Sequence, residues 1–405
     1  MTETTQRIPS GLDVESTTDL SLGRAQACAA RAEVVATVAK EHAAAVDSES
    51  VFPAASIAEA RAQGLLGAPV PGSLGGLGYS ITELCSTLER VGRECTSTAM
   101  ILAMHYSQVL CLTRHADTDL LRDMMRRVAG DGLLLASATT EIAIGGDTRT
   151  SSCAVDDTGD GRIRLHKSCP VISYGSAGDA IFVTARRNAD AVSSDQVLVA
   201  VVATDIDLTR TRGWDALGMR GTCSEAFELE ANTDAGAVFG VPFETISAQT
   251  MLPAAHCLWA SVWLGMATQA GLVARSVVQK AARKDPENPP PSALRLAELE
   301  VDLQAMTDVV RSSVARYQAA WDSPQTCESM PFAISMNTLK VSAAEAVRAI
   351  VGDAMVIVGI SGFANRSPVS LARLYRDSIG PSVMVNNDRI LQHTAKLQTV
   401  SRGLR

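Results

Sequence analysis

The pattern of apolar and polar positions divides the chain into three parts. In the first part, apolar residues recur at helical spacing in five runs: Arg24 to Ala45, Ser56 to Gln63, Ile81 to Val91, Ser97 to Arg114 and Asp119 to Val128. From Leu133 to about Pro242, short β-branched runs alternate with turn residues. From Met251 onward the helical spacing returns. The predicted order is therefore helical, β, helical.

The second and third parts can be divided further. Five runs in the middle part predict strands: Arg149 to Val155, Arg162 to His166, Ala180 to Arg186, Val197 to Thr204 and Ala226 to Ala231. The last part predicts four helices: Leu258 to Lys284, Ser292 to Trp321, Ile334 to Gly359 and Val383 to Ser401. We predict a disordered lead-in at residues 1–20, a helical domain at 21–132, a β domain at 133–247 and a helical domain at 248–405.

Composition narrows the classes of protein and partner. With 46% hydrophobic and 20% charged residues, the chain is typical of a globular protein of two or three domains. A net charge of -8 without a Lys/Arg cluster argues against a nucleic-acid partner. Nine cysteines without a C-x-x-C pair indicate neither a disulfide framework nor a metal site. Since Met1 to Leu20 has no apolar core of a signal peptide, we expect a cytoplasmic protein.

One uncharged stretch is long enough to cross a membrane. It runs from Met251 to Ala274 and contains Pro253, His256 and Gln269, with no aromatic and basic residues flanking it. We interpret it as a buried helix of a large bundle and expect no membrane partner.

The segment Ala138 to Asp147 carries the most concentrated loop chemistry. An apolar run before it leads to two hydroxyls, Thr139 and Thr140, a carboxylate and the pair Gly145 and Gly146. Glycines let the backbone turn sharply and bring N–H groups close to an anionic or carbonyl-rich ligand. The segment suggests a cofactor loop, although an ordinary strand-to-loop exit, in which Thr and Asp cap the turn, explains this stretch better on its own.

Several motifs together resemble the acyl-CoA dehydrogenase superfamily of flavoproteins. Thr140-Glu141 with Gly145-Gly146-Asp147 resembles its T-E-x-x-x-G-S-D flavin loop, and Ile172-Ser173 stands where the family has W-I-T. Leu217 to Thr222 resembles the L-G-M-R-x-T turn, and Arg373 to Asp377 resembles the late R-x-x-R-D helix. The motifs occur in the family's order over nearly the whole chain.

This resemblance implies an α+β architecture: an N-terminal helical domain, a middle β-barrel domain and a C-terminal four-helix bundle. It also implies FAD as the cofactor, with FMN as the alternative, and a homotetramer built through the C-terminal helices. An electron-transfer protein or a flavin reductase would be the redox partner. The implied cofactor-binding residues are Ala138, Thr139, Thr140, Gly145, Gly146, Ile172 and Ser173.

The chain departs from the family where a base is needed. The family's catalytic Glu is absent from the stretch Ser382 to Asp388. Removal of an α-proton requires a titratable group, and an amide cannot serve. Asp388 and His256 are the candidate bases, while Glu141, Arg220 and Asn386 are candidate substrate-binding residues. For Asp388, His256 and Glu141 the structural alternatives are a helix-start residue, a satisfied core histidine and a salt-bridge partner.

Three functions remain open from the sequence. The first is flavin-dependent oxidation of an acyl thioester, carried by CoA or an acyl-carrier protein, at the α,β carbons. The second is a monooxygenase that uses reduced flavin and O2 on a small aromatic or amine, because the family includes such enzymes without the catalytic Glu. The third is a catalytically silent assembly subunit.

Overall fold

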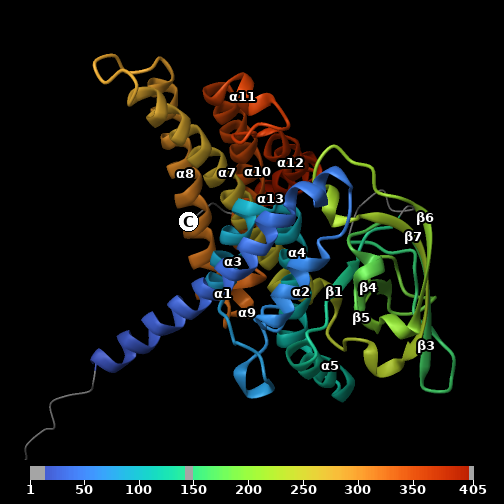
Figure 1. Cartoon of the computed structure of the whole chain (residues 1–405). Helices are drawn as coiled ribbons and strands as arrows, with labels where there is room; N and C mark the ends of the chain where they lie inside the picture. The colour runs from blue at the N-terminus through green and yellow to red at the C-terminus, as the bar shows by residue number, and fades with distance from the viewer. Residues whose placement is uncertain (1–13, 142–148, 401–405) are drawn as a thin grey trace, which may run out of the picture.

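The computed structural model of the chain describes residues 14–141 and 149–400, and its three regions follow the predicted order (Figure 1). The N-terminal region is helical and lies between the other two. It comprises α1 (Val14–Ser48), α2 (Ala54–Ala62), η1 (Gly72–Leu74), α3 (Ile81–Glu94), α4 (Thr96–His115) and α5 (Asp119–Gly130). All five helices predicted here are present. Helix α1 begins inside the segment predicted as a disordered lead-in, so that prediction is wrong for residues 14–20.

The middle region holds the strands, in two separate sheets. It comprises β1 (Leu135–Ala138), β2 (Asp156–Asp157), β3 (Arg162–Ile172), β4 (Ala180–Arg186), β5 (Gln196–Val202), β6 (Ile206–Arg212) and β7 (Glu225–Asp234), with the short helices η2 (Gly175–Ala177), η3 (Ala203–Asp205), η4 (Arg220–Thr222) and η5 (Ala235–Ala237). One sheet has the order β1-β4-β5 and the other β2-β3-β7-β6. Among the strands that the structure describes, β1 and β4 are the one pair that runs parallel, with Leu135 opposite Ala180. The α+β class is confirmed.

Three details of the predicted β region are corrected. The strands do not close into a barrel within the described residues, because no ladder joins the two sheets. The predicted strand at Arg149 to Val155 forms only an isolated bridge between Ala154 and Arg186. Strand β6 was not predicted, because its sequence IDLTRTR is largely exposed and lacks the apolar face that marks a strand.

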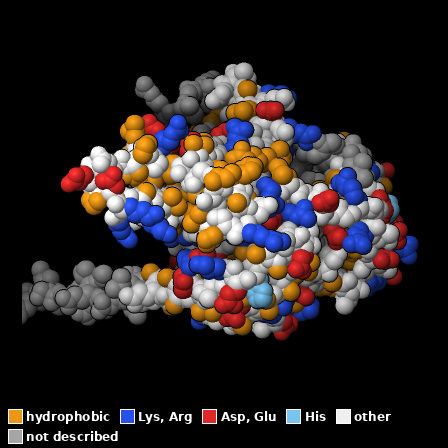
Figure 2. All heavy atoms as spheres, turned by 45° about the horizontal axis from the view of Figure 1, so that its top comes forward, with side chains coloured by type: hydrophobic (Ala, Val, Ile, Leu, Met, Phe, Trp, Pro, Cys, Tyr) orange, Lys and Arg blue, Asp and Glu red, His pale blue; other side chains and the backbone are white. Residues whose placement is uncertain are grey.

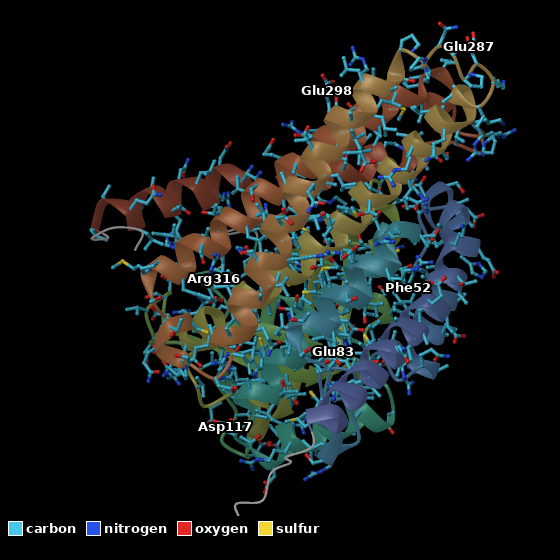
Figure 3. The ribbon with its side chains drawn as sticks, turned by 90° about the vertical axis from the view of Figure 1, so that its left-hand side faces the viewer. Phe52, Glu83, Asp117, Glu287, Glu298 and Arg316 are labelled. Carbon is cyan, nitrogen blue, oxygen red and sulfur yellow. The ribbon has the colours of Figure 1, made fainter. Side chains whose placement is uncertain are left out.

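The C-terminal region is a bundle of long helices. It comprises α6 (Phe243–Ile246), the π-helical turn η6 (Ser247–Met251), α7 (Leu252–Ala282), α8 (Ser292–Ala320), α9 (Pro324–Cys327), α10 (Met330–Val358), α11 (Ile360–Phe363), α12 (Ala372–Val383) and α13 (Asn387–Val400). Helices α7, α8 and α10 pack on one another, and α12 and α13 pack on α10. Figure 3 shows α8 along one side of the molecule, with Glu287 at the tip of the α7–α8 loop and Glu298 and Arg316 along the helix. The predicted helix Val383 to Ser401 is broken, since α12 ends at Val383 and α13 begins at Asn387.

Helix α7 is apolar because it forms the centre of the protein. The continuous helix from Phe243 to Ala282 is long and apolar enough to cross a membrane, but 72% of its most apolar window is buried inside the protein. Helices α3, α4, α8 and α10 all pack against α7. The interpretation as a buried bundle helix therefore agrees with the structure.

Two glycines let α3 and α7 cross at close range. A methyl group at Gly265 of α7 would overlap the backbone carbonyl of Glu89 in α3, and one at Gly92 would lie 2.9 Å from the carbonyl oxygen of Val262. Both neighbours are helix backbone, which cannot move aside as a flexible side chain could. Hydrogen bonds fix the start of α3, where the Ser80 side chain and Glu83 form a capping box. This crossing joins the N-terminal region to the bundle.

We predict that Gly265→Ala destabilises the protein although alanine favours helices. The added methyl group must push α3 from α7, at a cost of about 1–3 kcal/mol. Gly130→Ala is the matched control, because nothing lies within 4 Å of a methyl group at Gly130 in α5. Chemical unfolding followed by circular dichroism measures both. A Gly265→Ala protein as stable as the Gly130→Ala protein would contradict this close crossing.

Exposed hydrophobic side chains gather on the face of the molecule that carries α11 (Figure 2). Ile360 is 80% exposed, Phe363 is 69% exposed, and Val356 at the end of α10 is 58% exposed. Soluble monomers rarely leave large apolar side chains clustered in this way, so such a patch marks an interaction surface.

The homotetramer that the family resemblance implies needs interfaces between copies of the chain. We expect this patch to lie in one of them. The double variant Ile360→Asp, Phe363→Asp should place charges in that interface and lower the molar mass measured by light scattering. The matched control is Leu294→Asp with Val301→Asp, which are equally exposed residues on α8. An unchanged mass in the first double variant, or a monomeric wild type at micromolar concentration, would contradict the expectation.

Candidate functional site

Hydroxyl groups collect where β1 and β3 end. Ala138 is buried and pairs with Val183, and the partly exposed Thr139 and Thr140 follow it. The Thr140 hydroxyl donates to the carbonyl of Val171 at 3.4 Å, beside the last residues of β3. The two strand ends predicted to meet one cofactor thus lie together.

The hydroxyl group of Ser173 continues this site toward the turn after β6. Its Oγ lies 2.8 Å from the Oγ of Ser224, which lies 2.8 Å from the Oγ1 of Thr222. Thr222 Oγ1 in turn donates to the carbonyl of Met219 at 2.8 Å. We call Thr140, Ser173, Thr222 and Ser224 the hydroxyl cluster. Sequence reasoning included Thr222 in a motif but missed Ser224 as a site residue.

Backbone geometry fixes the cluster in place. Ile172 is buried at the end of β3, and Tyr174 adopts a left-handed conformation with φ 44°. This conformation costs a non-glycine residue about 1–2 kcal/mol, and two hydrogen bonds offset it. The Tyr174 N–H donates to the carbonyl of Thr222 at 2.8 Å, and its phenol donates to the carbonyl of Leu135 at 2.9 Å. The partly exposed Thr139, Thr140 and Ser173 can therefore present hydroxyls in fixed directions to the edge of a planar heterocycle.

Glu141 is held inside the protein. Its carboxylate lies 3.1 Å from the ammonium of the fully buried Lys167, and it accepts hydrogen bonds from the hydroxyls of Ser151 and Ser152 and from the Ser152 N–H. Burial by itself would raise the pKa of Glu141, but the charge of Lys167 and these hydrogen bonds outweigh it and lower the pKa to about 2. This geometry favours the salt-bridge alternative over substrate binding.

Lys167 could have been found in the sequence. In β3 the residues at 163, 165, 167 and 169 all point inward, so a lysine interrupts an otherwise apolar row. A buried lysine needs a counter-charge or a full set of hydrogen-bond acceptors. The pair with Glu141 anchors the chain immediately before residues 142–148. Gly145 and Gly146 fall in that segment and lie outside the described residues.

Arg220 is used within the protein. Its guanidinium donates to the carbonyls of Asp47 and Ala216 at 2.8 Å and pairs with Asp215 at 3.0 Å. These contacts tie the turn after β6 to the end of α1. They favour a structural role for Arg220 and leave its predicted substrate contact without support.

The same turn is tied to helix α12. The Met219 N–H donates to the buried carboxylate of Asp377 at 2.6 Å. Burial raises the pKa of Asp377 to about 6, against the opposing effect of the hydrogen bond from Met219. Asp47 also accepts a bond of 2.9 Å from Arg376. The hydroxyl cluster is thereby fixed relative to the bundle.

The predicted base His256 is a core residue of α7. It is 4% exposed, and its Nδ1 lies 3.0 Å from the carbonyl of Met336 in α10. Burial lowers the pKa of His256 to about 4, which leaves it neutral and weakly basic. The satisfied-histidine alternative explains these contacts.

Asp388 and Asn386 belong to the start of α13. Both are exposed, and the Asn386 side-chain oxygen accepts a hydrogen bond of 2.8 Å from the N–H of Asp388. Asn386 thus caps the helix, as asparagine commonly does. Asp388 occupies the helix-start role given as its structural alternative. Its neighbour Asn387 is buried and accepts a bond of 2.7 Å from Lys340, a contact that sequence reasoning missed.

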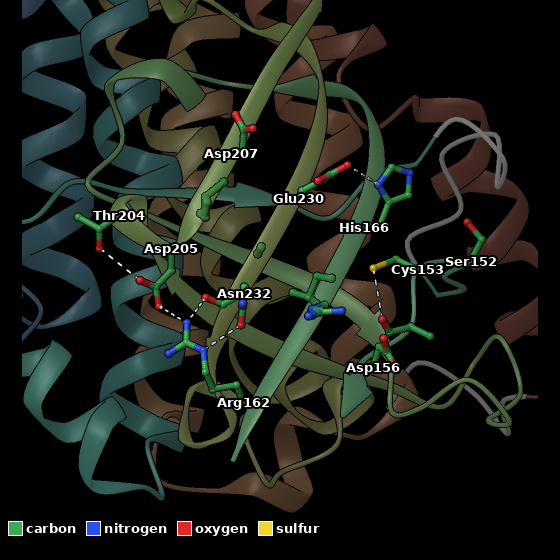
Figure 4. Close-up of a pocket in the computed structure, with 15 residues that line it drawn as sticks. Ser152, Cys153, Asp156, Arg162, His166, Thr204, Asp205, Asp207, Glu230 and Asn232 are labelled. Carbon is green, nitrogen blue, oxygen red and sulfur yellow. Dashed lines mark hydrogen bonds and ion pairs between the residues drawn. The ribbon is translucent and has the colours of Figure 1, made fainter. Parts of the chain in front are cut away.

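A surface hollow of about 790 Å³ lies elsewhere in the β region (Figure 4). Arg162 there bonds Asn232 at 2.9 Å and approaches Asp205, and His166 faces Glu230. None of the predicted site residues lines this hollow. The hydroxyl cluster therefore remains the better candidate site.

The known proteins that resemble this chain in sequence include two enzymes. Amino sugar nitrososynthase DnmZ of Streptomyces peucetius is 26% identical over 357 residues, 82% of each chain. Cyclohex-1-ene-1-carbonyl-CoA dehydrogenase of Geobacter metallireducens is 29% identical over 186 residues. That match covers 46% of this chain, and the chain spans about half, 49%, of that protein.

A solved structure has the same fold. The crystal structure of FMN-bound TdsC from Paenibacillus sp. A11-2 superposes with a TM-score of 0.80 at 16% identity, covering 92% of this chain and 96% of that one.

Two family models match directly. The acyl-CoA dehydrogenase N-terminal domain matches residues 25–132, and the acyl-CoA dehydrogenase C-terminal domain matches residues 247–383. Together they account for more than half of the chain. The chain therefore belongs to the acyl-CoA dehydrogenase family.

Proposed function

We propose that the protein is a flavin-dependent oxygenase that uses reduced flavin from a partner reductase and O2 to oxidise a small molecule. The observation that carries this proposal is that each titratable candidate is either held in other contacts or exposed at the surface. Glu141 is paired with Lys167, His256 is buried against Met336, and Asp388 begins a helix at the surface. Oxidation of an acyl thioester requires a base at the α-carbon, whereas oxygen transfer does not.

The residues at the site fit a flavin. The ring system has carbonyl oxygens and ring nitrogens at its edge, which the partly exposed hydroxyls of Thr139, Thr140 and Ser173 can meet. The phosphate end would lie toward Gly145 and Gly146, as the resemblance implies. A bound reduced flavin would supply two electrons, so that one atom of O2 enters the substrate and the other leaves as water.

The relatives indicate a substrate class. The nitrososynthase DnmZ acts on an amino sugar by its name, and its match extends along most of the chain. A small amine or an aromatic heterocycle is therefore the substrate class that we propose.

Two mixing experiments distinguish this function from acyl-thioester oxidation. Under anaerobic conditions, a panel of acyl thioesters should leave the oxidised flavin of the protein coloured. With reduced FMN and O2, amino-sugar nucleotides or small aromatics should increase oxygen uptake and give a product heavier by one oxygen. Bleaching of the flavin by any thioester would overturn the proposal, and failure to bind FMN or FAD would leave only the assembly-subunit hypothesis.

We predict that Glu141→Gln weakens flavin binding and stability together. Lys167 would remain buried without a counter-charge, which costs about 3 kcal/mol, and the flavin loop would lose its anchor. Fluorescence quenching and chemical unfolding at neutral pH measure the two effects. Asp195→Asn, which breaks an ion pair with Arg187 in which both side chains are about 40% exposed, is the control and should change neither.

The same pair predicts an acid dependence. The carboxyl pKa falls from its ordinary value of 4.5 to about 2 on folding, so the pair contributes its full stability above pH 4.5. That contribution is lost as the pH falls from 4.5 toward 2. Glu141→Gln should therefore show a smaller loss of stability over this range than the wild type. Equal losses in the two proteins would contradict the buried pair.

A further inference from the structure

Helix α10 carries a second buried lysine, Lys340, which is 0% exposed. Its ammonium donates to the carbonyl of Pro381 at 3.0 Å, the carbonyl of Val385 at 2.8 Å and the Asn387 side-chain oxygen at 2.7 Å. An ammonium has three N–H donors, and all three are used. No carboxylate forms an ion pair with Lys340 among the residues that the structure describes. Burying a charged ammonium without a counter-charge costs free energy, which its three hydrogen bonds must offset.

All three acceptors belong to one connection. We call residues 384–386, between α12 and α13, the link. Pro381 precedes the link in the last turn of α12, Val385 lies within it, and Asn387 begins α13. Val385 adopts a left-handed conformation with φ 45°, which is strained for a β-branched residue. The ammonium therefore holds a strained backbone at three points and satisfies carbonyls left open at the end of α12.

A carboxylate strengthens this arrangement from the same helix. Glu345 of α10 accepts a bond of 3.1 Å from the Asn387 amide and one of 3.3 Å from the Ser382 hydroxyl. Its second oxygen pairs with Arg348 at the surface. Two further groups face Lys340 from other helices. His256 of α7 is neutral at physiological pH because burial lowers its pKa to about 4, and Pro381 of α12 contributes its carbonyl. Lys340 is thus the one cation that bonds both sides of the link in the described chain.

The link lies between two elements that reach the candidate site. Before it, α12 is tied by Asp377 to Met219, whose carbonyl accepts from Thr222 of the hydroxyl cluster. After it, α13 approaches Arg149, whose guanidinium nitrogen lies 3.0 Å from the Nδ1 of His393. Arg149 lies two residues after the segment Ala138 to Asp147, which resembles the flavin loop. A shift of the link would therefore move α12 and α13, and with them their contacts to Met219 and Arg149.

We propose that Lys340 is a positioning residue: it fixes the link and, through α12, the position of the hydroxyl cluster relative to the bundle. This inference rests on the proposed function for its ligands, but the holding of the link can be tested without them. Burial lowers the pKa of Lys340 to about 8, and the charge of Glu345 opposes that effect. A neutral amine has only two N–H donors, so one of the three bonds is lost as the pH rises through 8.

Hydrogen exchange of the backbone amides around the link tests the proposal. Useful reporters are the N–H of Met384, bonded to Gly380, and the N–H of Ile390, bonded to Asn386. In Lys340→Met, exchange at these amides should be about tenfold faster at neutral pH, the equivalent of one buried hydrogen bond. Amides of α4 should not change. Lys396→Met on α13, an exposed lysine, is the matched control.

The pH profile separates positioning from general packing. After correction for the intrinsic pH dependence of exchange, wild-type amides at the link should exchange faster as the pH rises from about 7 to about 9. Lys340→Arg keeps its charge throughout this range, so it should restore protection and show no such step. If Lys340→Met also loses protection in α4, its fold has failed, and the profile of the wild type decides.

Two results would overturn the proposal: a Lys340→Met link as protected as in the wild type, or a wild-type profile without a step near pH 8. An FMN titration accompanies the exchange, and Lys340→Met should bind FMN more weakly than Lys396→Met. If the wild type binds no flavin at all, the proposed function fails while the exchange data still judge the role of Lys340.

Discussion

The site depends on one buried hydrogen bond, between the N–H of Met219 and the carboxylate of Asp377. It joins a turn of the β region to a helix of the bundle, and a methyl group at the adjacent Gly218 would overlap the backbone of Arg376. Because Thr222 and Ser224 follow this turn, the position of the hydroxyl cluster relative to the bundle is set here. The pair of Arg376 and Asp47 then extends the same joint to α1. Three regions distant in the sequence thus meet at one contact.

Two buried lysines hold segments of the chain that border the candidate site. Lys167 in β3 pairs with Glu141 at 3.1 Å, where the predicted flavin loop begins. Lys340 in α10 has no carboxylate partner of this kind among the described residues, and it bonds instead to the link between α12 and α13. Each lysine is buried, so each must gain enough from its partners to offset its lost hydration. Both sets of partners lie at boundaries of the same candidate site.

Much of the fold was predictable because most of its helices are long, and because the shorter α3 and α5 each have a clear apolar face. The buried strands β4 and β5 were predicted for a different reason, because each carries a continuous apolar run. The local sequence pattern did not predict elements with low burial or a strained backbone. The exposed β6 lacks an apolar face, and the break before α13 depends on a left-handed Val385 and a lysine far away in the sequence.

The candidate site was only partly predictable. The strand ends at Thr140 and Ser173 do meet, as the order of motifs indicated. The three titratable candidates could not be judged from sequence, because their chemistry depends on burial and partners. His256 is enclosed by α10, and Glu141 meets a lysine from another strand. Both facts are tertiary, and they turn the interpretation from proton abstraction toward oxygen transfer.

A crystal structure of the protein with FMN would test the central claim most directly. We predict that the edge of the flavin ring lies within hydrogen-bond distance of Thr140 or Ser173. Electron density for the flavin in the hollow of the β region, or at any position away from these hydroxyls, would contradict the account.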